Sequence, residues 1–429
     1  MSGLAEVIDL SEASQKKLIN EVSFAGKNNL FDMKKIIKNH SSKLAAAVFF
    51  GVAAQSVSAY EVHPMGTNMP AVDFHGFASQ GFLASSDYNY LGNDTKNGSF
   101  NFTEAGLNAS INPFPRTRIT AQAFTFDLGN DVGQYDVVLD YAQAEYTFND
   151  YLGVRGGRIR RPQGIYNAVQ DVDMARTFVL LPQGVYDSRW RDFYVSLDGG
   201  EFFGTLPLGK AGSLSYELYG GLDNCAENGG VAKFIGFLTG LRPVSINQEP
   251  HSGVQLWWNT PVDGLRLGAN GGYKFDFEFK QAVGPFSATG YKEDISYFQG
   301  SIEYCWKKWT FQTEYYTYLL HPLPETAAIV GPGTRGDAWY VAASYRFNKW
   351  VETGVYYSEW YTDVEHRGDS AQYQKDAALS LRFDLRDWWV FKVEGHYIHG
   401  TGLLEDNGAN PSQDNRGWFM LALKTTLSF

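Results

Sequence analysis

The chain has 429 residues and a formal net charge of −11, which gives no electrostatic support to nucleic-acid binding. Aromatic residues make up 16% of it and glycines number 45, yet the mean hydropathy is only −0.29. The two cysteines, Cys225 and Cys305, are too few for the disulfide framework of a small secreted domain. Much aromatic surface without long apolar runs is typical of a transmembrane β-barrel, whose strands alternate lipid-facing and water-facing residues.

The N-terminal region predicts export. Basic residues between Met33 and Lys43 precede an uncharged stretch, Leu44 to Ala54, and Val57-Ser58-Ala59 is a small-residue cleavage site. That stretch is about half the roughly 20 residues that a helical membrane span needs, so insertion as a helix is not expected. We predict an upstream extension or wrongly assigned start over 1–32, a signal peptide over 33–59 and an outer-membrane barrel over 60–429.

From residue 72 onward, segments of about 9–14 residues alternate polar and apolar positions, which is the period of a strand that is wet on one face. Sixteen such segments can be counted. In the last, one parity holds Phe419, Leu421, Leu423, Thr425, Leu427 and Phe429, and the other holds Lys424, Thr426 and Ser428. Strand 372–385 likewise sets Ala377, Leu379, Leu381 and Phe383 against Asp376, Ser380, Arg382 and Asp384, and strand 294–306 sets Phe298, Ile302, Tyr304 and Trp306 against Gln299, Ser301 and Glu303.

The connections between the predicted strands alternate between short and long along the chain. The short ones are Asn149-Asp150, Thr260 to Gly264, Lys307-Lys308, Asn348-Lys349 and Arg386-Asp387, and the long ones are 162–191, 222–253, 279–293, 320–336, 362–372 and 400–415. The alternation of short and long connections predicts an all-β fold, a transmembrane antiparallel barrel of about sixteen strands with short periplasmic turns and long extracellular loops. A soluble β-sandwich or propeller, the alternative, does not explain the alternation. Cys225 and Cys305 then lie at opposite rims, too far apart for a disulfide.

After the fifth strand, Tyr151 to Pro162, comes the third outer loop, Gln163 to Arg191. Residues 155–192 hold seven arginines against four aspartates, which suggests a constriction with a transverse field. The candidate constriction residues are Arg158, Arg160, Arg176, Arg189, Arg191, Asp171 and Asp173. Arg158 and Arg160 are preferred to Arg155 and Arg161 as lumen residues, because Val154 and Ile159 are expected to face the wall. Alternatively, these arginines pair with the aspartates and hold the loop against the wall, and both roles stay open.

Other motifs do not predict a reactive site. The run Gly204 to Lys210 resembles a phosphate-binding loop, but Ala211 stands where Ser or Thr should hold magnesium, so a periplasmic turn is expected. His396 and His399 have opposite parity on one strand, which is poor geometry for a metal pair. The oxygen-rich segment 405–415 could hold calcium, but polar turn residues look the same. No nucleophile elbow or metalloprotease motif is present, so no catalytic residue, metal or cofactor is predicted.

The chain resembles proteobacterial porin-like outer-membrane proteins through a few motifs. They are Phe77 to Leu83, Gly157 to Pro162 with Gly164 to Asn167, Asp171-Val172-Asp173 and Leu180 to Gln183. The resemblance implies an outer-membrane homotrimer in which the third loop narrows the lumen and small hydrophilic solutes or ions diffuse passively. The terminal Phe429 looks like the signal read by the outer-membrane assembly machinery. The loop lacks the Pro-Glu-Phe-Gly-Gly run of enterobacterial porins, and there is no room for the coiled-coil extension of some substrate-specific relatives.

Two other functions remain open. A structural or adhesive barrel with a plugged lumen would use its long outer loops to bind surfaces or partners. A barrel enzyme would assemble its reactive residues from separate strands. The expected partners are small hydrophilic solutes or ions, the outer-membrane lipid and the outer-membrane assembly machinery, and nucleic acid is not expected.

Overall fold

The computed structural model describes residues 60–62, 70–92, 94–129, 133–223, 225, 229–233, 243–247, 249–283, 286–322, 333–404, 410 and 412–429. The upstream extension over 1–32 and the signal peptide over 33–59 lie outside the described residues, as does most of the candidate calcium segment 405–415. Within the described ranges, no helix has the length and apolar character that a membrane span requires.

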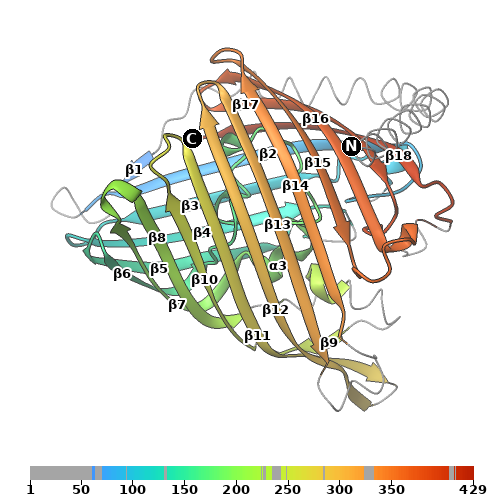
Figure 1. The fold of residues 1–429 in the computed structure, drawn as a ribbon, viewed down its shortest axis with the longest axis horizontal. Coiled ribbons are helices and arrows are strands. Elements are labelled where there is room, and N and C mark those ends of the chain that lie inside the picture. The colour runs from blue at the N-terminus through green and yellow to red at the C-terminus, as the bar shows by residue number, and fades with distance from the viewer. Residues whose placement is uncertain are drawn as a thin grey trace, which may run out of the picture.

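Sixteen strands close into one antiparallel barrel in the described part of the chain (Figure 1). They are β2 (Val72–Ser85), β3 (Thr103–Ile111), β4 (Thr117–Asp127), β5 (Val137–Asn149), β6 (Leu152–Arg160), β7 (Ser196–Pro207), β8 (Ser213–Asp223), β10 (Pro250–Asn259), β11 (Leu265–Val283), β12 (Phe286–Trp306), β13 (Trp309–Pro322), β14 (Arg335–Arg346), β15 (Val351–Tyr361), β16 (Tyr373–Arg386), β17 (Trp389–His399) and β18 (Gly417–Ser428). The sheet closes where β18 pairs with β2, and β8 pairs with β10 across the long connection between them. The predicted fold and strand number are confirmed.

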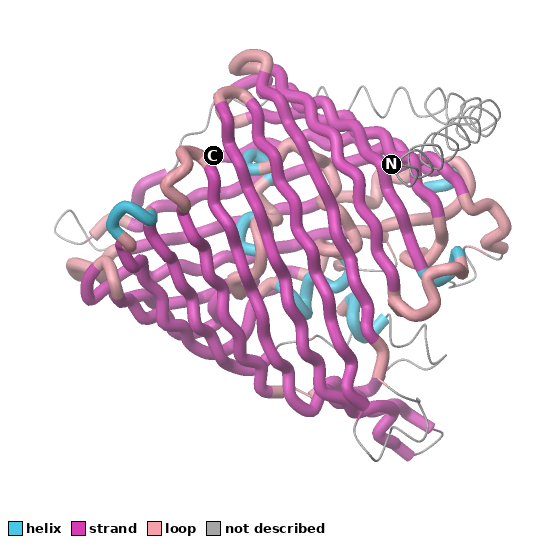
Figure 2. The backbone as a smooth tube through the Cα atoms, viewed as in Figure 1, coloured by secondary structure: helices cyan, strands magenta, loops and turns pink. Residues whose placement is uncertain are grey.

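Shorter elements complete the chain. The strand β1 (Tyr60–Val62) pairs beside the start of β2, and β9 (Pro243–Ile246) pairs with the outer end of β11. The helical turns are η1 (Thr95–Asn97), η2 (Asn167–Val169), η3 (Asp173–Ala175), η4 (Ser188–Trp190), α3 (Arg191–Tyr194), η5 (Gly209–Ala211) and η6 (Ser370–Gln372). Figure 2 shows several of these turns within the outline of the barrel.

The two faces of the wall differ as the sequence predicts. The residues of β18 that pair across the sheet with Ala84, Phe82 and Ala78 are Leu421, Leu423 and Leu427, all of one parity. On neighbouring strands the same face exposes large apolar side chains: Phe298, Ile302, Phe311, Val341, Val355, Leu379 and Leu381 are each 39–54% exposed. The opposite parity buries polar groups, among them Lys392, Glu394, Lys424 and Gln299. The wall is therefore apolar outside and polar inside, as a barrel in lipid requires.

The prediction of a long loop over 279–293 is wrong. Strands β11 and β12 continue through most of it, with Phe279 opposite Tyr291 and Val283 opposite Phe286. Strand β9 adds a third member, pairing Ile246 with Phe279. The three strands satisfy one another's backbone groups beyond the barrel rim, which is why this segment does not need the wall to remain extended.

The ends of the barrel sheet meet at Gly76 and Phe429. Their backbones exchange two hydrogen bonds, of 3.1 and 2.9 Å. A Cβ atom on Gly76 would lie 2.6 Å from the ring of Phe429, so glycine makes room for the terminal aromatic side chain. Cys225 and Cys305 are both free thiols, as their predicted separation requires.

Candidate functional site

The third outer loop, Arg161 to Val195, joins β6 to β7 and folds into the barrel, and it is called the inward loop below. Its backbone reaches β10, where Gln255 accepts the N–H of Gly164 at 3.0 Å, and also β17, where Glu394 accepts two N–H groups. These strands lie on separate parts of the wall. The loop therefore crosses the lumen, as the resemblance implies, and occupies part of its cross-section.

On one side, the loop is fastened to Glu314 of β13. This buried carboxylate accepts the backbone N–H of Ile165 at 2.9 Å and the hydroxyl of Tyr186. The wall supplies three further donors, Tyr340 at 2.9 Å, Gln299 at 3.0 Å and Ser301 at 2.5 Å. A buried carboxylate with this many donors avoids the cost of an unpaired charge in the interior.

On the other side, the loop is fastened to β17 and β18. Glu394 accepts the backbone N–H groups of Val179 and Leu180, each at 2.8 Å. Lys392 donates to the carbonyl oxygens of Asp173 at 2.9 Å and Phe178 at 3.1 Å. All these groups are buried, so the contacts are shielded from solvent.

Asp173 is the most heavily paired residue of the loop. Its Oδ2 lies 2.8 Å from Nζ of Lys424 and accepts the Thr426 hydroxyl at 2.7 Å, and its Oδ1 lies 2.9 Å from a guanidinium nitrogen of Arg176. Burial alone would raise the pKa of Asp173, but Lys424, Lys392 and Arg176 hold it well below its ordinary value. Asp173 therefore stays ionised and anchors the loop to the wall.

Two arginines meet at Asp171. Arg160, at the end of β6, lies 2.6 Å from Asp171, and Arg191 lies 2.8 Å from it. Both arginines also pair with Asp140 of β5, Arg191 at 2.7 Å. The Arg191 guanidinium stacks over the ring of Phe124 at 3.8 Å. Burial would raise the pKa of Asp171, but Arg191 and Arg160 lower it below its ordinary value.

The remaining candidate, Arg189, pairs with Asp187 at 2.6 Å and donates to the carbonyl oxygen of Leu403 at 2.7 Å. Four of the predicted arginines therefore each have a carboxylate partner: Arg160, Arg176, Arg189 and Arg191. Asp171 and Asp173, also predicted, are among these partners. The structure brings these six predicted residues into the barrel. Their contacts match the alternative in which the arginines hold the loop in place.

The preference for Arg158 as a lumen residue is wrong. Opposed residues in an antiparallel pair share a face, and Arg158 opposes Asp198, which opposes the outward, 39% exposed Leu222. Arg158 pairs with Asp198 at 2.8 Å on that outer face. Ile159, expected at the lipid wall, is instead fully buried and packs with Leu197 and Tyr219.

The two arginines that the sequence interpretation set aside point inward. Arg155 opposes Glu201, pairs with it at 3.0 Å and pairs with Glu145 at 2.9 Å. Arg161 is fully buried and donates to the carbonyl oxygen of Phe193 at 3.1 Å. Val154 does face outward, since it opposes the 57% exposed Phe202. Ile159 has the other parity, and the face assignment failed because apolar residues are also buried on the lumen side.

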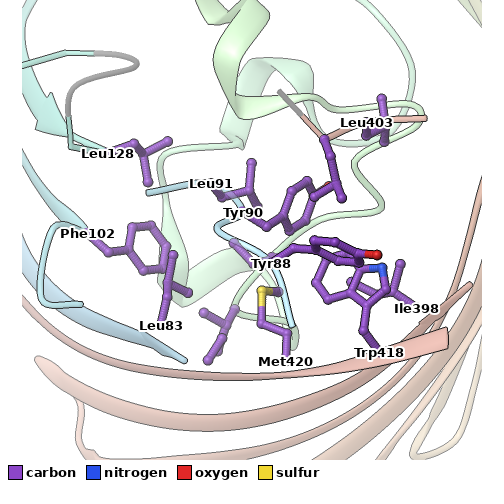
Figure 3. Close-up of a cluster of buried hydrophobic side chains, with 14 residues drawn as sticks. Leu83, Tyr88, Tyr90, Leu91, Phe102, Leu128, Ile398, Leu403, Trp418 and Met420 are labelled. Carbon is purple, nitrogen blue, oxygen red and sulfur yellow. The ribbon is translucent and has the colours of Figure 1, made fainter. Parts of the chain in front are cut away.

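An apolar cluster packs at the outer end of the lumen (Figure 3). It joins Val179 and Leu180 of the inward loop to the loops that follow β2 and β17, through Tyr88, Tyr90 and Leu403. Trp418 of β18 packs edge-on against Tyr88 at 5.7 Å and Tyr90 at 5.4 Å. The tip of the inward loop is thus held by apolar packing as well as by ion pairs.

The main wall anchors were not predicted from sequence. These anchors are Glu314, Lys392, Glu394 and Lys424. Each lies at an inward position of a strand in which polar and apolar residues alternate, so parity alone indicates a lumen-facing charge. Their partners on the inward loop are more than a hundred residues away along the chain, and no local pattern identifies them. Among the described residues, no three His, Cys, Asp or Glu side chains are arranged to hold a metal ion.

No protein-family model and no curated protein sequence matches the chain. Several solved structures are similar to the chain in fold. The trimer form of OmpT, an outer membrane protein of Vibrio cholerae, is 14% identical with a TM-score of 0.53, and the match covers 84% of this chain. An anion-selective porin from Comamonas acidovorans is 10% identical (TM-score 0.53, 84% covered), and the outer membrane channel DcaP of Acinetobacter baumannii is 9% identical (TM-score 0.52, 87% covered). Each match spans 100% of the solved chain.

At these identities the likeness shows the fold. The chain has the closed sixteen-strand architecture of outer-membrane porins, with an apolar outer band and a loop folded inward. This architecture fits the outer-membrane location expected from the sequence.

Proposed function

We propose that this protein is an outer-membrane porin through which small hydrophilic solutes diffuse passively. The observation that carries the proposal is the polar inner face of a sixteen-strand barrel, across which the anchored third outer loop extends. Sixteen strands enclose a lumen wide enough for water, whereas eight are filled by side chains. Diffusion needs no covalent chemistry, and the proposed role is not enzymatic.

The inward loop is the proposed constriction, and the charges beside it are proposed to set selectivity. Arg160, Arg176, Arg189 and Arg191 line this region together with Asp171 and Asp173. Because each arginine has a carboxylate partner, the local field is that of ion pairs and not of free cations. We therefore expect weak ion selectivity that single charge removals can shift.

A homotrimer is proposed as the assembled form. The outer face of β4 to β7 carries small residues in opposed pairs, Ala121 with Ala142, Ala144 with Gly156, and Gly156 with Gly200. Small side chains allow two walls to approach closely. The similar Vibrio OmpT is described in a trimer form. Phe429 is proposed as the signal for the assembly machinery.

Planar-bilayer recording on the purified protein tests the pore. We expect stepwise, ohmic conductance increases, and reversal potentials in a salt gradient then give the sign of selectivity. If protein that is folded, as judged by heat-modifiable migration, gives no conductance steps, the porin proposal is wrong.

The plugged, structural or adhesive barrel is the second candidate, and the apolar cluster at the outer end favours it. Tyr88, Tyr90 and Leu403 bring two further loops onto the inward loop. Replacing Tyr88 and Tyr90 by alanine distinguishes the two functions. A porin would conduct in both forms, whereas a plugged barrel would conduct only after the cluster is opened.

A further inference from the structure

The outer wall carries a cationic aromatic shelf at two neighbouring periplasmic turns. We define this shelf as the turns between β12 and β13 and between β14 and β15, with the aromatic residues beside them. Three lysines project from the turns, Lys307, Lys308 and Lys349, and all are exposed. The turns themselves, Lys307-Lys308 and Phe347 to Trp350, contain no acidic residue. The shelf therefore has a local charge of one sign on a chain whose net charge is negative.

The two turns form one surface because they are bonded to each other. The Lys308 ammonium donates to the carbonyl oxygen of Phe347 at 2.8 Å, and the N–H of Arg346 donates to the carbonyl oxygen of Lys308 at 2.9 Å. Two acidic groups of the adjoining strands, Glu352 and Asp384, have inward parity and pair with Arg346, at 2.7 and 2.6 Å. Asp263 and Asp387 lie on the turns to either side, and in the described part of the chain neither forms an ion pair with Lys307, Lys308 or Lys349.

Aromatic rings continue the shelf up the outer wall. Trp309 stacks on Phe311 with ring centres 5.6 Å apart and contacts Tyr345 at 4.7 Å, and Tyr345 contacts Phe347 at 4.9 Å. Trp306 and Trp350, 48% and 60% exposed, flank this row. Tryptophan and tyrosine favour the level where acyl chains give way to headgroups.

The lysines stand at the edge of this aromatic row. The ammonium of Lys307 lies 4.7 Å from the Trp306 ring centre, and that of Lys349 lies 5.0 Å from the Trp350 ring centre. These contacts hold each charge beside a ring, at the depth of the lipid phosphates. The arrangement pairs apolar surface for acyl chains with cations for a negatively charged headgroup.

We propose that this shelf binds anionic phospholipid, such as phosphatidylglycerol, in the periplasmic leaflet in preference to zwitterionic phospholipid. The acyl chains lie on Trp309, Phe311 and Tyr345, and the headgroup phosphate contacts Lys307 and Lys349. The site lies on the outer wall, away from the lumen. It is therefore independent of whether the barrel conducts.

The barrel offers a matched control on another turn. Lys210, between β7 and β8, is also exposed and also lies near an outward tryptophan, since Trp258 donates to the carbonyl oxygen of Ala211 at 2.8 Å. It is the one lysine of its turn, whereas the shelf gathers three on two bonded turns. If the clustered lysines make the site, a substitution at Lys210 should leave the binding of anionic phospholipid unchanged.

Native mass spectrometry of the purified full-length protein in detergent tests the proposal, with phosphatidylglycerol and phosphatidylethanolamine of the same acyl chains added separately. The wild type is expected to retain phosphatidylglycerol at concentrations at which phosphatidylethanolamine dissociates. The K307Q/K349Q variant, which leaves the Lys308 hydrogen bond intact, is expected to bind phosphatidylglycerol roughly tenfold or more weakly. The K210Q variant should match the wild type.

Equal retention of the two lipids by the wild type would overturn the proposal. So would undiminished phosphatidylglycerol binding by K307Q/K349Q, or a loss of binding in K210Q as large as in the double variant. Heat-modifiable migration of each variant verifies that the barrel is folded, so a folding defect is not mistaken for a lost lipid site.

Discussion

The carboxylate of Glu394 on β17 accepts the backbone N–H of Leu180, 214 residues earlier in the chain, at 2.8 Å. The same carboxylate accepts the N–H of Val179 and contacts the imidazole of His396 at 3.1 Å. One wall residue therefore holds two consecutive peptide groups of the inward loop, and all of these groups are buried.

Glu394→Ala is expected to destabilise the loop, because the N–H groups of Val179 and Leu180 would be buried without acceptors. Each such group costs about 1–3 kcal/mol. Urea unfolding of the refolded protein measures the loss, and Glu394→Gln, which keeps one acceptor oxygen, should lose less. Glu365→Gln changes an exposed outer-loop carboxylate and serves as the control. Equal stability of Glu394→Ala and Glu365→Gln would contradict the anchoring role.

Acid should loosen the inward loop through Asp171. Its pKa in the folded protein is below its ordinary value of about 3.9. A lowered folded pKa contributes stability that is fully present above the ordinary pKa and is lost as the pH falls toward the folded one. The melting temperature of the wild type should therefore fall more steeply below about pH 4 than that of Asp171→Asn. Parallel curves for the two proteins would show that Asp171 does not carry this dependence.

The faces assigned to Arg158 and Arg160 predict different effects on conduction. Arg160→Ala removes a cation from the pair at Asp171 and should move the reversal potential in a salt gradient toward cation preference. Arg158→Ala changes the outer face and should leave the reversal potential at the wild-type value. A shift in Arg158→Ala as large as in Arg160→Ala would place Arg158 in the lumen after all.

The lipid-facing parity can be tested at Leu379. This side chain is 54% exposed on the outer face of β16. A lysine near the middle of the lipid-facing band costs about 2–4 kcal/mol, so Leu379→Lys should unfold from lipid vesicles at a clearly lower urea concentration. Glu365→Lys, in an outer loop, supplies the control and should unfold near the wild-type midpoint.

Gly157 and Gly156 form a matched pair on β6. Gly157 has φ of +120°, and a Cβ there would lie 2.3 Å from the carbonyl oxygen of Ala142, whereas the nearest atom to a Cβ on Gly156 is 3.9 Å away. Gly157→Ala should therefore destabilise the barrel by about 1–3 kcal/mol. Gly156→Ala should have a much smaller effect. Equal thermal stability of the two variants would mean that the backbone at Gly157 relaxes without cost.

Much of this fold could be predicted from sequence because lipid-facing and lumen-facing residues alternate with a period of two along each strand of the wall. The parity of Leu421, Leu423 and Leu427 needs only neighbours along one strand, and the structure confirms it. The alternation of short and long connections gives the strand number in the same local way. Strand β1 was missed because three residues are too few to show an alternation. Strand β9 and the extended ends of β11 and β12 were missed because they pair beyond the barrel rim.

The candidate site was predicted only in part. Composition locates the arginine-rich loop, and Asp171 and Asp173 do take part in its ion pairs. The facing of Arg158 and Ile159 was wrong because a covered lumen buries apolar residues such as Leu197 as well as polar ones. Glu314 and Glu394 could not be matched to the loop, since their contacts depend on how the closed barrel brings distant strands together.

The inward loop also has a mechanical consequence for the barrel. It is bonded to Glu314 on one part of the wall and to Glu394 on another, so it acts as a brace between them. Flattening the barrel would change the distance between those two points and would break buried hydrogen bonds. The shape of the cross-section and the position of the loop are therefore coupled, and lateral pressure in the membrane should act on both together.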